Sequence, residues 1–427
     1  MLKDISVIII FPLSQKVLQQ MLVSLRKLQA RISSVIVIQA TNGTLNKNQV
    51  NDWLNDLCFI TSKNNELAHT LDNIMDQTNN RYVLFLSHTH CLSASVNSEV
   101  LQLEQPKTVL STGYLFRNHA IYLPLLVLSK YIKKIGGFTN IQPPFNEAFL
   151  PAWLANIDKS CQLTIGNLID PSLETRNTTT STKYMIAQKY QFKKENLTSP
   201  SLSVLISNYN MEKYVDIAVA SCLLQNMPFD QILIIDDGST DYSLKKLLQW
   251  DRNKQVKLFT KENEGKAKAL NTLLPYVTSE FILELDADDW LDPNAVAMIK
   301  KHLLELPENS SLLYGNFRRW KQINDEVFFK GIKKGKEIHR PTELLTYSFP
   351  LGPRIYRTST LKSTGGFLIN DFENGRLYED VSTLLQLIKH SKLNYSNFTI
   401  YNIREHQESN TKINRSKWSE YLNHIDL

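Results

Sequence analysis

Two groups of carboxylates follow apolar runs in the second half of the chain. Asp236 and Asp237 follow the run 232–235, and the segment 286–289, which holds three more aspartates, follows the run 281–285. Because ligands bind where the carboxyl ends of parallel strands meet, we expect both groups to lie in one cleft. Carboxylates gathered this closely repel one another unless a cation or a hydroxyl-rich ligand compensates. Oxygen ligands without neighbouring His or Cys favour Mg²⁺ or Mn²⁺ held partly by substrate phosphate, so the pattern predicts a metal-diphosphate site.

Each group alone also has a simpler interpretation. Asp, Gly and Ser favour turns, so the segment 236–239 is equally typical of a polar turn between two elements. The segment 286–289 could likewise be a loop that precedes a helix. The occurrence of both groups together favours the binding site.

A further acidic pair, Glu379 and Asp380, stands at the start of a helical pattern. Apolar residues recur there at the spacing of one helix face, at positions 381, 384, 385 and 388. The helix dipole keeps a carboxylate in the first turn ionised, so Asp380 could accept a proton. The alternative is that acidic residues are simply favoured at helix starts.

The sequence also contains an internal repeat. The matching segments and their offsets are 5–9 with 202–206 (197), 36–40 with 233–237 (197), Asn73 with Asn271 (198), 85–90 with 284–289 (199) and 136–138 with 365–367 (229). A near-constant offset over some eighty residues indicates two copies of one fold. The late rise in the offset from 199 to 229 predicts about thirty extra residues in the second copy.

A chain of 427 residues is too long for one ordinary core, and the repeat divides it naturally. Residues 171–200 are rich in Thr, Ser, Asn and Lys, which is typical of a linker. We therefore place domains at 1–170 and 201–427. Apolar runs alternate with helical patterns, which predicts α/β domains, each with a mostly parallel sheet covered on both faces.

Composition limits the classes of function. The 48 basic and 42 acidic residues give a charge of only +6, without the basic stripe that nucleic-acid binding requires. Apolar stretches fall short of a membrane span, and the four cysteines form no close pairs. We therefore expect a soluble cytoplasmic protein that does not bind nucleic acid. A basic segment at 330–340 leaves a peripheral position at the inner face of the membrane open, and the oligomeric state is not fixed by the sequence.

From Ser203 to about Ser409 the chain resembles the inverting family 2 glycosyltransferases, which use the GT-A nucleotide-sugar fold. The matching motifs, in chain order, are Ser207-Asn208-Tyr209-Asn210, Asp236-Asp237-Gly238-Ser239, Asn263-Glu264-Gly265-Lys266, Asp286-Ala287-Asp288, Gly365-Gly366-Phe367 and Glu379-Asp380. The first looks like the family's opening Pro-Thr-Tyr-Asn segment, with Ser replacing the usual Pro. The resemblance implies two tandem GT-A-like, Rossmann-like domains.

The resemblance also implies roles for individual residues. Asp237 would bind the nucleotide base, Asp286 would face the ribose, and Asp380 would be the catalytic base beside Glu379. Asp288 and the late His406 would hold Mn²⁺ or Mg²⁺, although an isolated surface histidine is an alternative for His406. The implied nucleotide-binding residues are Ser207, Tyr209, Asn210, Asp236, Asp237, Asn263, Lys266 and Asp286.

The implied activity is a metal-dependent, hexosyltransferase-like transfer of one sugar. The donor would be a nucleotide-diphosphate sugar, preferably a UDP-sugar, and the acceptor a hydroxyl of a glycan, a lipid-linked intermediate or a peptide. Such a reaction would serve surface polysaccharide, cell-wall or glycoconjugate synthesis. One alternative is a non-catalytic nucleotide-sugar-binding or scaffold protein. A nucleotidyltransferase is another, disfavoured because the segment 207–210 has no Gly-rich phosphate loop.

The first copy lacks the acidic motifs. It has Gln39-Ala40, Ser87-His88-Thr89 and Asn146-Glu147-Ala148 where the second copy has the nucleotide, metal and Glu-Asp acids. We therefore expect residues 1–170 to form a degenerate GT-A-like domain that is inactive as a transferase.

Overall fold

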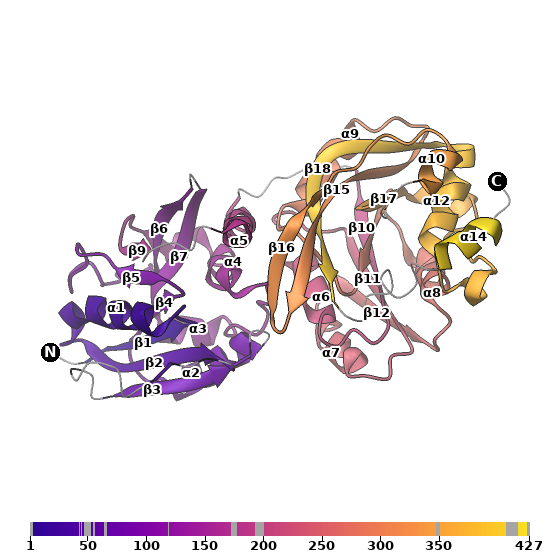
Figure 1. Cartoon of the computed structure of the whole chain (residues 1–427). Coiled ribbons are helices and arrows are strands. Elements are labelled where there is room, and N and C mark those ends of the chain that lie inside the picture. Colours follow the sequence, from indigo (N-terminus) through magenta and orange to yellow (C-terminus); the bar gives the residue numbers. More distant parts are fainter. Residues whose placement is uncertain are drawn as a thin grey trace. The chain divides into compact units, whose positions relative to one another are not determined.

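The chain folds into two compact units, residues 1–191 and 192–427, called here the first and the second unit (Figure 1). The computed structural model describes residues 3–41, 43, 45–46, 53, 56–63, 66–117, 119–171, 177–192, 200–346, 351–406 and 417–424. No helix among these described residues is long and apolar enough to cross a membrane.

The first unit alternates strands and helices around one main sheet. Its strands are β1 (Ile5–Ile10), β2 (Ile32–Ala40), β3 (Leu57–Ser62), β4 (Tyr82–Ser87), β5 (His90–Leu92), β6 (Val109–Phe116), β7 (His119–Leu128), β8 (Gln162–Thr164) and β9 (Ile169–Pro171). Its helices are α1 (Gln15–Leu25), α2 (Leu67–Gln77), α3 (Ser129–Lys134), α4 (Phe149–Ala155) and α5 (Thr178–Lys189), with the 3-10 turns η1 (Arg26–Leu28), η4 (Asn146–Ala148) and η5 (Lys159–Cys161). The main sheet has the strand order β3-β2-β1-β4-β7-β6-β8.

The second unit follows the same plan. Its strands are β10 (Leu202–Asn208), β11 (Gln231–Asp237), β12 (Val256–Lys261), β13 (Phe281–Asp286), β14 (Trp290–Leu291), β15 (Ser310–Ile323), β16 (Glu326–Lys333), β17 (Arg354–Arg357) and β18 (Lys392–Glu405). Its helices are α6 (Val215–Leu223), α7 (Ser243–Trp250), α8 (Lys266–Leu273), α9 (Ala295–Leu304), α10 (Pro341–Leu345), α11 (Thr358–Ser363), α12 (Glu379–His390) and α14 (Trp418–His424), with the 3-10 turns η6 (Leu274–Tyr276) and η7 (Phe372–Gly375). The strand order is β12-β11-β10-β13-β17-β15-β18-β14.

Strand order and direction confirm the repeat. In each unit four parallel strands are followed by one antiparallel strand, β7 or β17, which separates them from the next pair. The outer pair, β6 with β8 or β15 with β18, is parallel in both units. Strand β16 and helix α10 are inserted between β15 and β17, where the first unit has only the short connection from β6 to β7. The insertion accounts for the predicted extra residues, and the predicted fold class of two tandem α/β domains is confirmed.

The predicted linker is wrong over part of its length, because residues 178–189 form helix α5 within the first unit. The Asn177 side chain caps this helix by accepting a hydrogen bond from the amide of Thr180. Lys183 of α5 forms an ion pair with Glu147, with 3.0 Å between Nζ and Oε1. The helix has no regular apolar stripe, which is why its sequence resembled an irregular segment.

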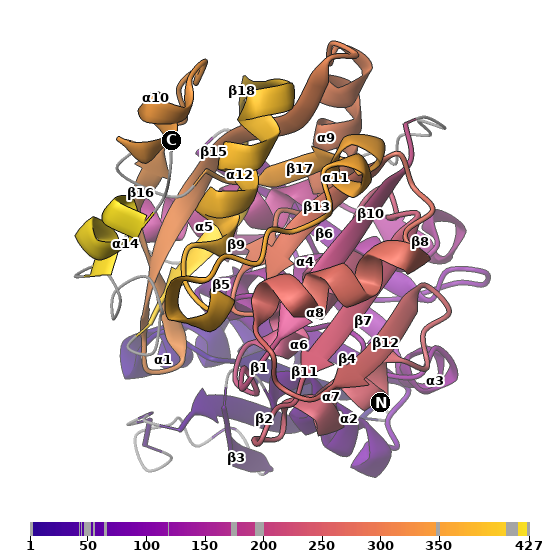
Figure 2. The same cartoon turned by 90° about the vertical axis from the view of Figure 1, so that its right-hand side faces the viewer.

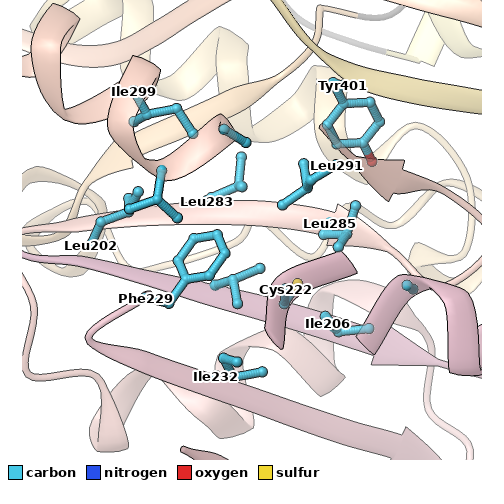
Figure 3. Packing of buried hydrophobic residues seen from close by; sticks show 14 of the residues in the cluster. Leu202, Ile206, Cys222, Phe229, Ile232, Leu283, Leu285, Leu291, Ile299 and Tyr401 are labelled. Atoms are coloured by element: carbon cyan, nitrogen blue, oxygen red, sulfur yellow. The ribbon is translucent and has the colours of Figure 1, made fainter. Parts of the chain in front are cut away.

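Apolar side chains cover both faces of the sheet in the second unit. On one face, β10 and β13 pack against α6 and α9 in a cluster that includes Leu202, Ile206, Cys222 and Ile299 (Figure 3). On the other face, alternate residues of the same strands pack against α8 and α12. Figure 2 shows α8 crossing the face of β10 and β11 that is turned to the viewer. The carboxyl ends of the strands are thereby left as the edge where polar groups gather.

Each copy of the Gly-Gly-Phe motif closes against a polar side chain from a helix. In the second unit, Asn271 of α8 donates to the carbonyl of Phe367 at 2.7 Å and accepts from the Phe367 amide at 2.8 Å. In the first unit, the Phe138 amide donates to Asp72 at 2.8 Å. The sequence paired Asn73 with Asn271, so that match was one residue out of register. The contact explains why both motifs keep a second glycine, since its φ is positive and a Cβ would meet the Asn271 or Asp72 side chain.

We predict that Gly366→Ala destabilises the protein more than Gly365→Ala. Both glycines have positive φ, +86° and +91°, so backbone strain is common to the two variants. A Cβ at Gly366 also meets Oδ1 of Asn271, whereas a Cβ at Gly365 meets nothing within 4 Å. We expect an extra loss of about 1–3 kcal/mol in the free energy of unfolding, measured by urea denaturation.

The first unit provides an independent repetition of this experiment. Gly137→Ala should cost more than Gly136→Ala, because only the Cβ at Gly137 meets the Asp72 carboxylate. Equal losses within each pair would show that the contacts with Asn271 and Asp72 do not restrict these positions.

Candidate functional site

The ends of β10, β11 and β13 lie side by side at one edge of the second sheet. Strand β10 runs between β11 and β13, with Asn208 opposite Asp236 and Ser207 opposite Asp286. Residues separated by about eighty positions in the chain are therefore neighbours across adjacent strands. The structure thus brings the two predicted acidic groups to one edge of the sheet, where we expect the cleft.

Asp236 fixes the turn after β11. Its carboxylate accepts hydrogen bonds from Asn208 Nδ2 and Ser239 Oγ, both at 2.7 Å, and from the Ser239 amide at 3.0 Å. Asn210 holds the same turn from the other side, since its side-chain oxygen accepts from the Thr240 amide at 2.8 Å. Asp236 and Asn210 therefore shape the end of the cleft through contacts within the protein.

Asp237 joins β11 to the loop before α8. Its carboxylate accepts from the amides of Glu264 at 3.1 Å and Gly265 at 2.8 Å, and it lies 3.3 Å from Lys261 Nζ. Asn263 Nδ2 donates to the Asp237 carbonyl at 3.0 Å. The predicted pair Asp237 and Asn263 is thus brought together.

The predicted residues on the loop after β10 differ in exposure. The side chain of Tyr209 is 43% exposed, although large aromatic rings are usually covered. Ser207 lies within β10, opposite Asp286 on the adjacent strand β13. An exposed ring at the carboxyl edge of a parallel sheet can stack on a flat ligand.

A chain of alternating charges crosses the cleft from Asp286 to Asp380. Lys266 Nζ pairs with Asp286 and lies 2.8 Å from Glu284. The Arg354 guanidinium binds Glu284 through two parallel hydrogen bonds of 2.8 and 2.9 Å. Its third nitrogen lies 3.3 Å from Asp380 Oδ2. Acids from two distant parts of the chain are thereby linked through two cations and one central carboxylate.

The central carboxylate is buried and fully hydrogen-bonded. Glu284 is 3% exposed and also accepts from the Tyr356 hydroxyl at 2.9 Å. Burial opposes ionisation of Glu284, but the Arg354 and Lys266 cations hold its pKa below its usual range. Burial likewise opposes the charged form of Lys266, and the acids around it, Asp286 and Glu284, raise its pKa well above the ordinary value.

The Glu-Asp pair occupies the first turn of α12. Tyr378, with φ of +59°, turns the chain into the helix, and Asp380 Oδ1 accepts from the Val381 amide at 2.8 Å. Burial and the adjacent Asp380 raise the pKa of Glu379 to about 7, while Lys266 opposes the shift. Lys266 thus compensates Glu379 only in part, whereas Arg354 lies in direct contact with the Asp380 carboxylate.

The side chains of Asp288 and His406 contact each other. His406 Nε2 lies 3.0 Å from Asp288 Oδ2, and its ring packs on Tyr214 at 4.7 Å between centroids. Arg404 Nε donates to the Asp288 carbonyl at 2.9 Å. The structure thus brings together the two residues predicted to hold a metal. A surface location for His406 is excluded, because it is only 5% exposed.

A carboxylate and an imidazole fit a divalent cation that takes its remaining ligands from diphosphate and water. Among the residues that the structure describes, no group of three or more His, Cys, Asp or Glu side chains could hold a metal by itself. The nearby Asp289 is held by the protein, because its Oδ1 accepts from the Arg404 amide at 2.8 Å. Burial and the neighbouring Asp288 and Asp286 raise the pKa of Asp289 well above its usual range.

The corresponding place in the first unit is occupied by protein. Glu147 of η4 pairs with Lys183 of α5. After β4, His90 at the start of β5 is buried, and His88 in the turn before it is half-buried. Burial lowers the pKa of His90 to about 3, so this side chain is neutral at physiological pH. The first unit therefore keeps one acid at this place, Glu147, and that acid is paired with a lysine of the same unit.

Two residues of the cleft, Glu284 and Arg354, were missed in the sequence. Glu284 gave a weak signal as the only charged residue in the apolar run 281–285. Its repeat partner is Phe85, which marks it as a polar exception in a buried strand. Arg354 gave no signal in the sequence, because its pairing with Glu284 depends on the register between β13 and β17.

Comparisons with known proteins find a family match for part of the second unit. Residues 203–360 match the model described as Glycosyl transferase family 2. An uncharacterized glycosyltransferase of Haemophilus influenzae is 35% identical over 158 residues, which are 35% of this chain and 63% of that protein. The resemblance to family 2 that the motifs predicted is thus confirmed for the matched part of the second unit.

Other relatives match shorter parts or at lower identity. A chondroitin synthase of Pasteurella multocida is 34% identical over 107 residues, which are 25% of this chain and 11% of that enzyme. The putative teichuronic acid biosynthesis glycosyltransferase TuaG of Bacillus subtilis is 28% identical over 230 residues, 51% of this chain and 83% of the relative. The chain thus spans less than two thirds of the first two relatives named. TarS 1-349 of S. aureus, solved in complex with UDP-GlcNAc, has a TM-score of 0.40 and 21% identity, covering 50% of this chain and 60% of that one.

We predict that Glu379→Gln stabilises the protein at high pH. In the wild type the folded-state pKa of about 7 exceeds the ordinary 4.5, so stability falls as the pH rises between these values and Glu379 ionises. Gln does not ionise, so the variant should gain on the wild type between pH 5 and pH 8. At about 1.4 kcal/mol per pKa unit, we expect a relative gain of about 1–3 kcal/mol, measured by urea denaturation at both pH values.

The control is Glu326→Gln, at an exposed position at the start of β16. Its stability relative to the wild type should not change between the two pH values. A Glu379→Gln variant that behaves like this control would contradict the raised pKa.

Proposed function

We propose that the second unit is an inverting glycosyltransferase that moves one sugar from a nucleotide-diphosphate sugar to an acceptor hydroxyl. The observation that carries this proposal is that Asp286 and Asp380 both lie near the guanidinium of Arg354. Arg354 lies 3.9 Å from Asp286 and 3.3 Å from Asp380, although the two acids are almost a hundred residues apart in sequence. A donor-side acid and an acceptor-side acid in one cleft are what a single displacement between two substrates requires.

We place the nucleotide at the carboxyl ends of β10 and β11, with a UDP-sugar as the expected donor. Asp237 and Asn263 line the base, Tyr209 offers an exposed ring, and Asp286 faces the ribose. Lys266 stands at the start of α8, where a cation can approach the diphosphate. Asp288 and His406 would hold Mn²⁺ or Mg²⁺, which would neutralise charge on the diphosphate oxygens.

Asp380 is placed to act as the general base. The acceptor oxygen attacks the anomeric carbon and its proton passes to Asp380, while the bond from that carbon to the diphosphate oxygen breaks. Attack opposite the leaving group inverts the configuration, and the products are the glycosylated acceptor and a nucleoside diphosphate. A base at this position contributes about 10² to 10⁴ in rate.

The acceptor is proposed as a glycan, a lipid-linked intermediate or a peptide in surface polysaccharide or cell-wall synthesis. Relatives named for chondroitin and teichuronic acid synthesis support a polysaccharide context. We propose a cytoplasmic setting in which the protein can work at the inner face of the membrane. We further propose that the first unit is inactive, because Lys183 and Glu147 fill the corresponding position.

We predict that Asp380→Asn abolishes transfer and spares nucleotide binding. The amide keeps the shape of the side chain but cannot take the acceptor proton. We expect transfer to fall by about 10² to 10⁴, measured as nucleoside diphosphate released in the presence of acceptor. The affinity for UDP, measured by titration calorimetry, should stay within about twofold.

The control is Asp325→Asn, in the turn between β15 and β16, which should leave transfer unchanged. An Asp380→Asn enzyme with full activity would remove the assignment of the base. A nucleotidyltransferase would instead release pyrophosphate when it is given a nucleoside triphosphate and a sugar phosphate.

We predict that each chain binds one UDP and that Asp288→Ala removes the metal-dependent part of the affinity. Calorimetric titration of UDP with and without Mn²⁺ measures both quantities. The repeat supplies a matched control, because Thr89 is the residue that corresponds to Asp288 in the first unit. Thr89→Ala should bind UDP like the wild type, and binding of two UDP molecules per chain would show that the first unit is not inactive.

A further inference from the structure

The ion pair between Glu284 and Arg354 lies deep in the second unit. The two residues face each other across the antiparallel strands β13 and β17, and they are 3% and 8% exposed. Two residues away along the same strands, on the same face of the sheet, Ile282 and Tyr356 belong to the apolar cluster beneath α8 and α12. The pair therefore occupies positions where the fold otherwise places apolar side chains.

The first unit shows what the same fold contains at these positions. Strands β4 and β7 pair in the same way as β13 and β17, with Leu84 opposite Leu126. The next residues along the two strands are Phe85 and Leu125, and both are buried. Phe85 packs edge-on against Phe138, with 6.0 Å between ring centroids. The fold is therefore built without an ion pair here.

Stability does not explain the pair in the second unit. Removing two charges from water is costly, and their attraction repays this only when the geometry and the remaining hydrogen bonds are good. Apolar side chains of similar volume in place of a buried pair are often neutral or stabilising. The first unit contains such a replacement, so the charged version in the second unit requires another reason.

The pair is present where the carboxylates are present. The second unit has Asp286 at the end of β13 and Asp380 at the start of α12, and both lie within 4 Å of Arg354. The first unit has Ser87 at the end of β4 and Ala148 at the place matched to Asp380 by sequence. The Glu284–Arg354 pair and the acids Asp286 and Asp380 thus occur together in one copy and are replaced together in the other, which keeps only Glu147 at the matched acidic positions.

The geometry of Arg354 gives it a specific task. Its two bonds to Glu284 fix the plane of the guanidinium, because a planar fork matches a carboxylate in one orientation. The remaining nitrogen then points at Asp380 Oδ2, while the Val381 amide holds Asp380 Oδ1. Both oxygens of Asp380 are therefore held, and on the other side Glu284 also holds Lys266 against Asp286.

We propose that Glu284 and Arg354 are positioning residues for sugar transfer, which hold the base Asp380 in fixed register with the donor-side residues Asp286 and Lys266. This inference rests on the proposed function. Neither residue needs to touch the substrate. A misplacement of about 1 Å in a reacting group can cost about 10² in rate, so the pair acts on transfer and not on the fold.

The experiment installs the apolar pair of the first unit in the second. The variant combines Glu284→Phe and Arg354→Leu with Tyr356→Phe, which removes the hydroxyl that would otherwise lose its acceptor. We expect an unchanged or higher melting temperature, UDP affinity within about threefold of the wild type, and a kcat for transfer lower by about 10² or more. The matched control is Phe85→Leu in the first unit, which should leave transfer unchanged.

A second variant keeps the proposal testable if the triple variant does not fold. Arg354→Lys retains the charge and can still pair with Glu284, but a single ammonium cannot replace the fork that also reaches Asp380. We expect kcat to fall by about tenfold or more, with the KM for the donor unchanged.

The outcomes separate the inference from the proposed function. A folded triple variant that transfers sugar within about threefold of the wild type overturns the inference, as does Arg354→Lys with wild-type kcat. A wild-type protein that transfers no sugar from any nucleotide sugar overturns the proposed function itself. Loss of kcat with donor affinity retained supports both.

Discussion

The second unit holds several carboxylates in one small volume, and their mutual repulsion has to be compensated. Glu284 and Asp286 of β13 converge with Glu379 and Asp380 of α12, and among the residues that the structure describes the cations Lys266 and Arg354 lie between them. The alternation of charge satisfies three of these acids. The fourth, Glu379, receives too little compensation, which is why its pKa rises to about 7. The cleft is therefore short of positive charge, and a ligand that brings a cation would complete it.

The repeat separates what the scaffold needs from what the cleft needs. Both units share strand order, strand direction and the closure of a Gly-Gly-Phe motif on α2 or α8. At the positions of Glu284 and Arg354 the second unit has a buried charged network, whereas the first unit has Phe85 and Leu125 there. The network is therefore an addition to a fold that is already stable in its apolar form.

Local sequence patterns predicted the elements well, because apolar runs and helix starts are local features. The strands β10 to β13, the helix α12 and the convergence of Asp236, Asp237 and Asp286 all followed from such runs. Helix α5 was missed, because Lys183 is held by an ion pair with Glu147 and not by an apolar stripe. Glu284 and Arg354 were missed for a different reason. Their contact depends on the register of an antiparallel strand that arrives seventy residues later, and no local pattern encodes that register.

The two cations of the cleft differ in how firmly they are held. The Arg354 side chain is 9% exposed and is fixed by a planar fork on Glu284, so it can serve only one arrangement of Asp380. The Lys266 side chain is 27% exposed on a flexible stem, and a point charge of this kind can exchange one anionic partner for another. The acceptor side of the cleft is therefore rigid and the donor side adaptable. This asymmetry suits a reaction in which the diphosphate leaves with its charge while the base stays in place.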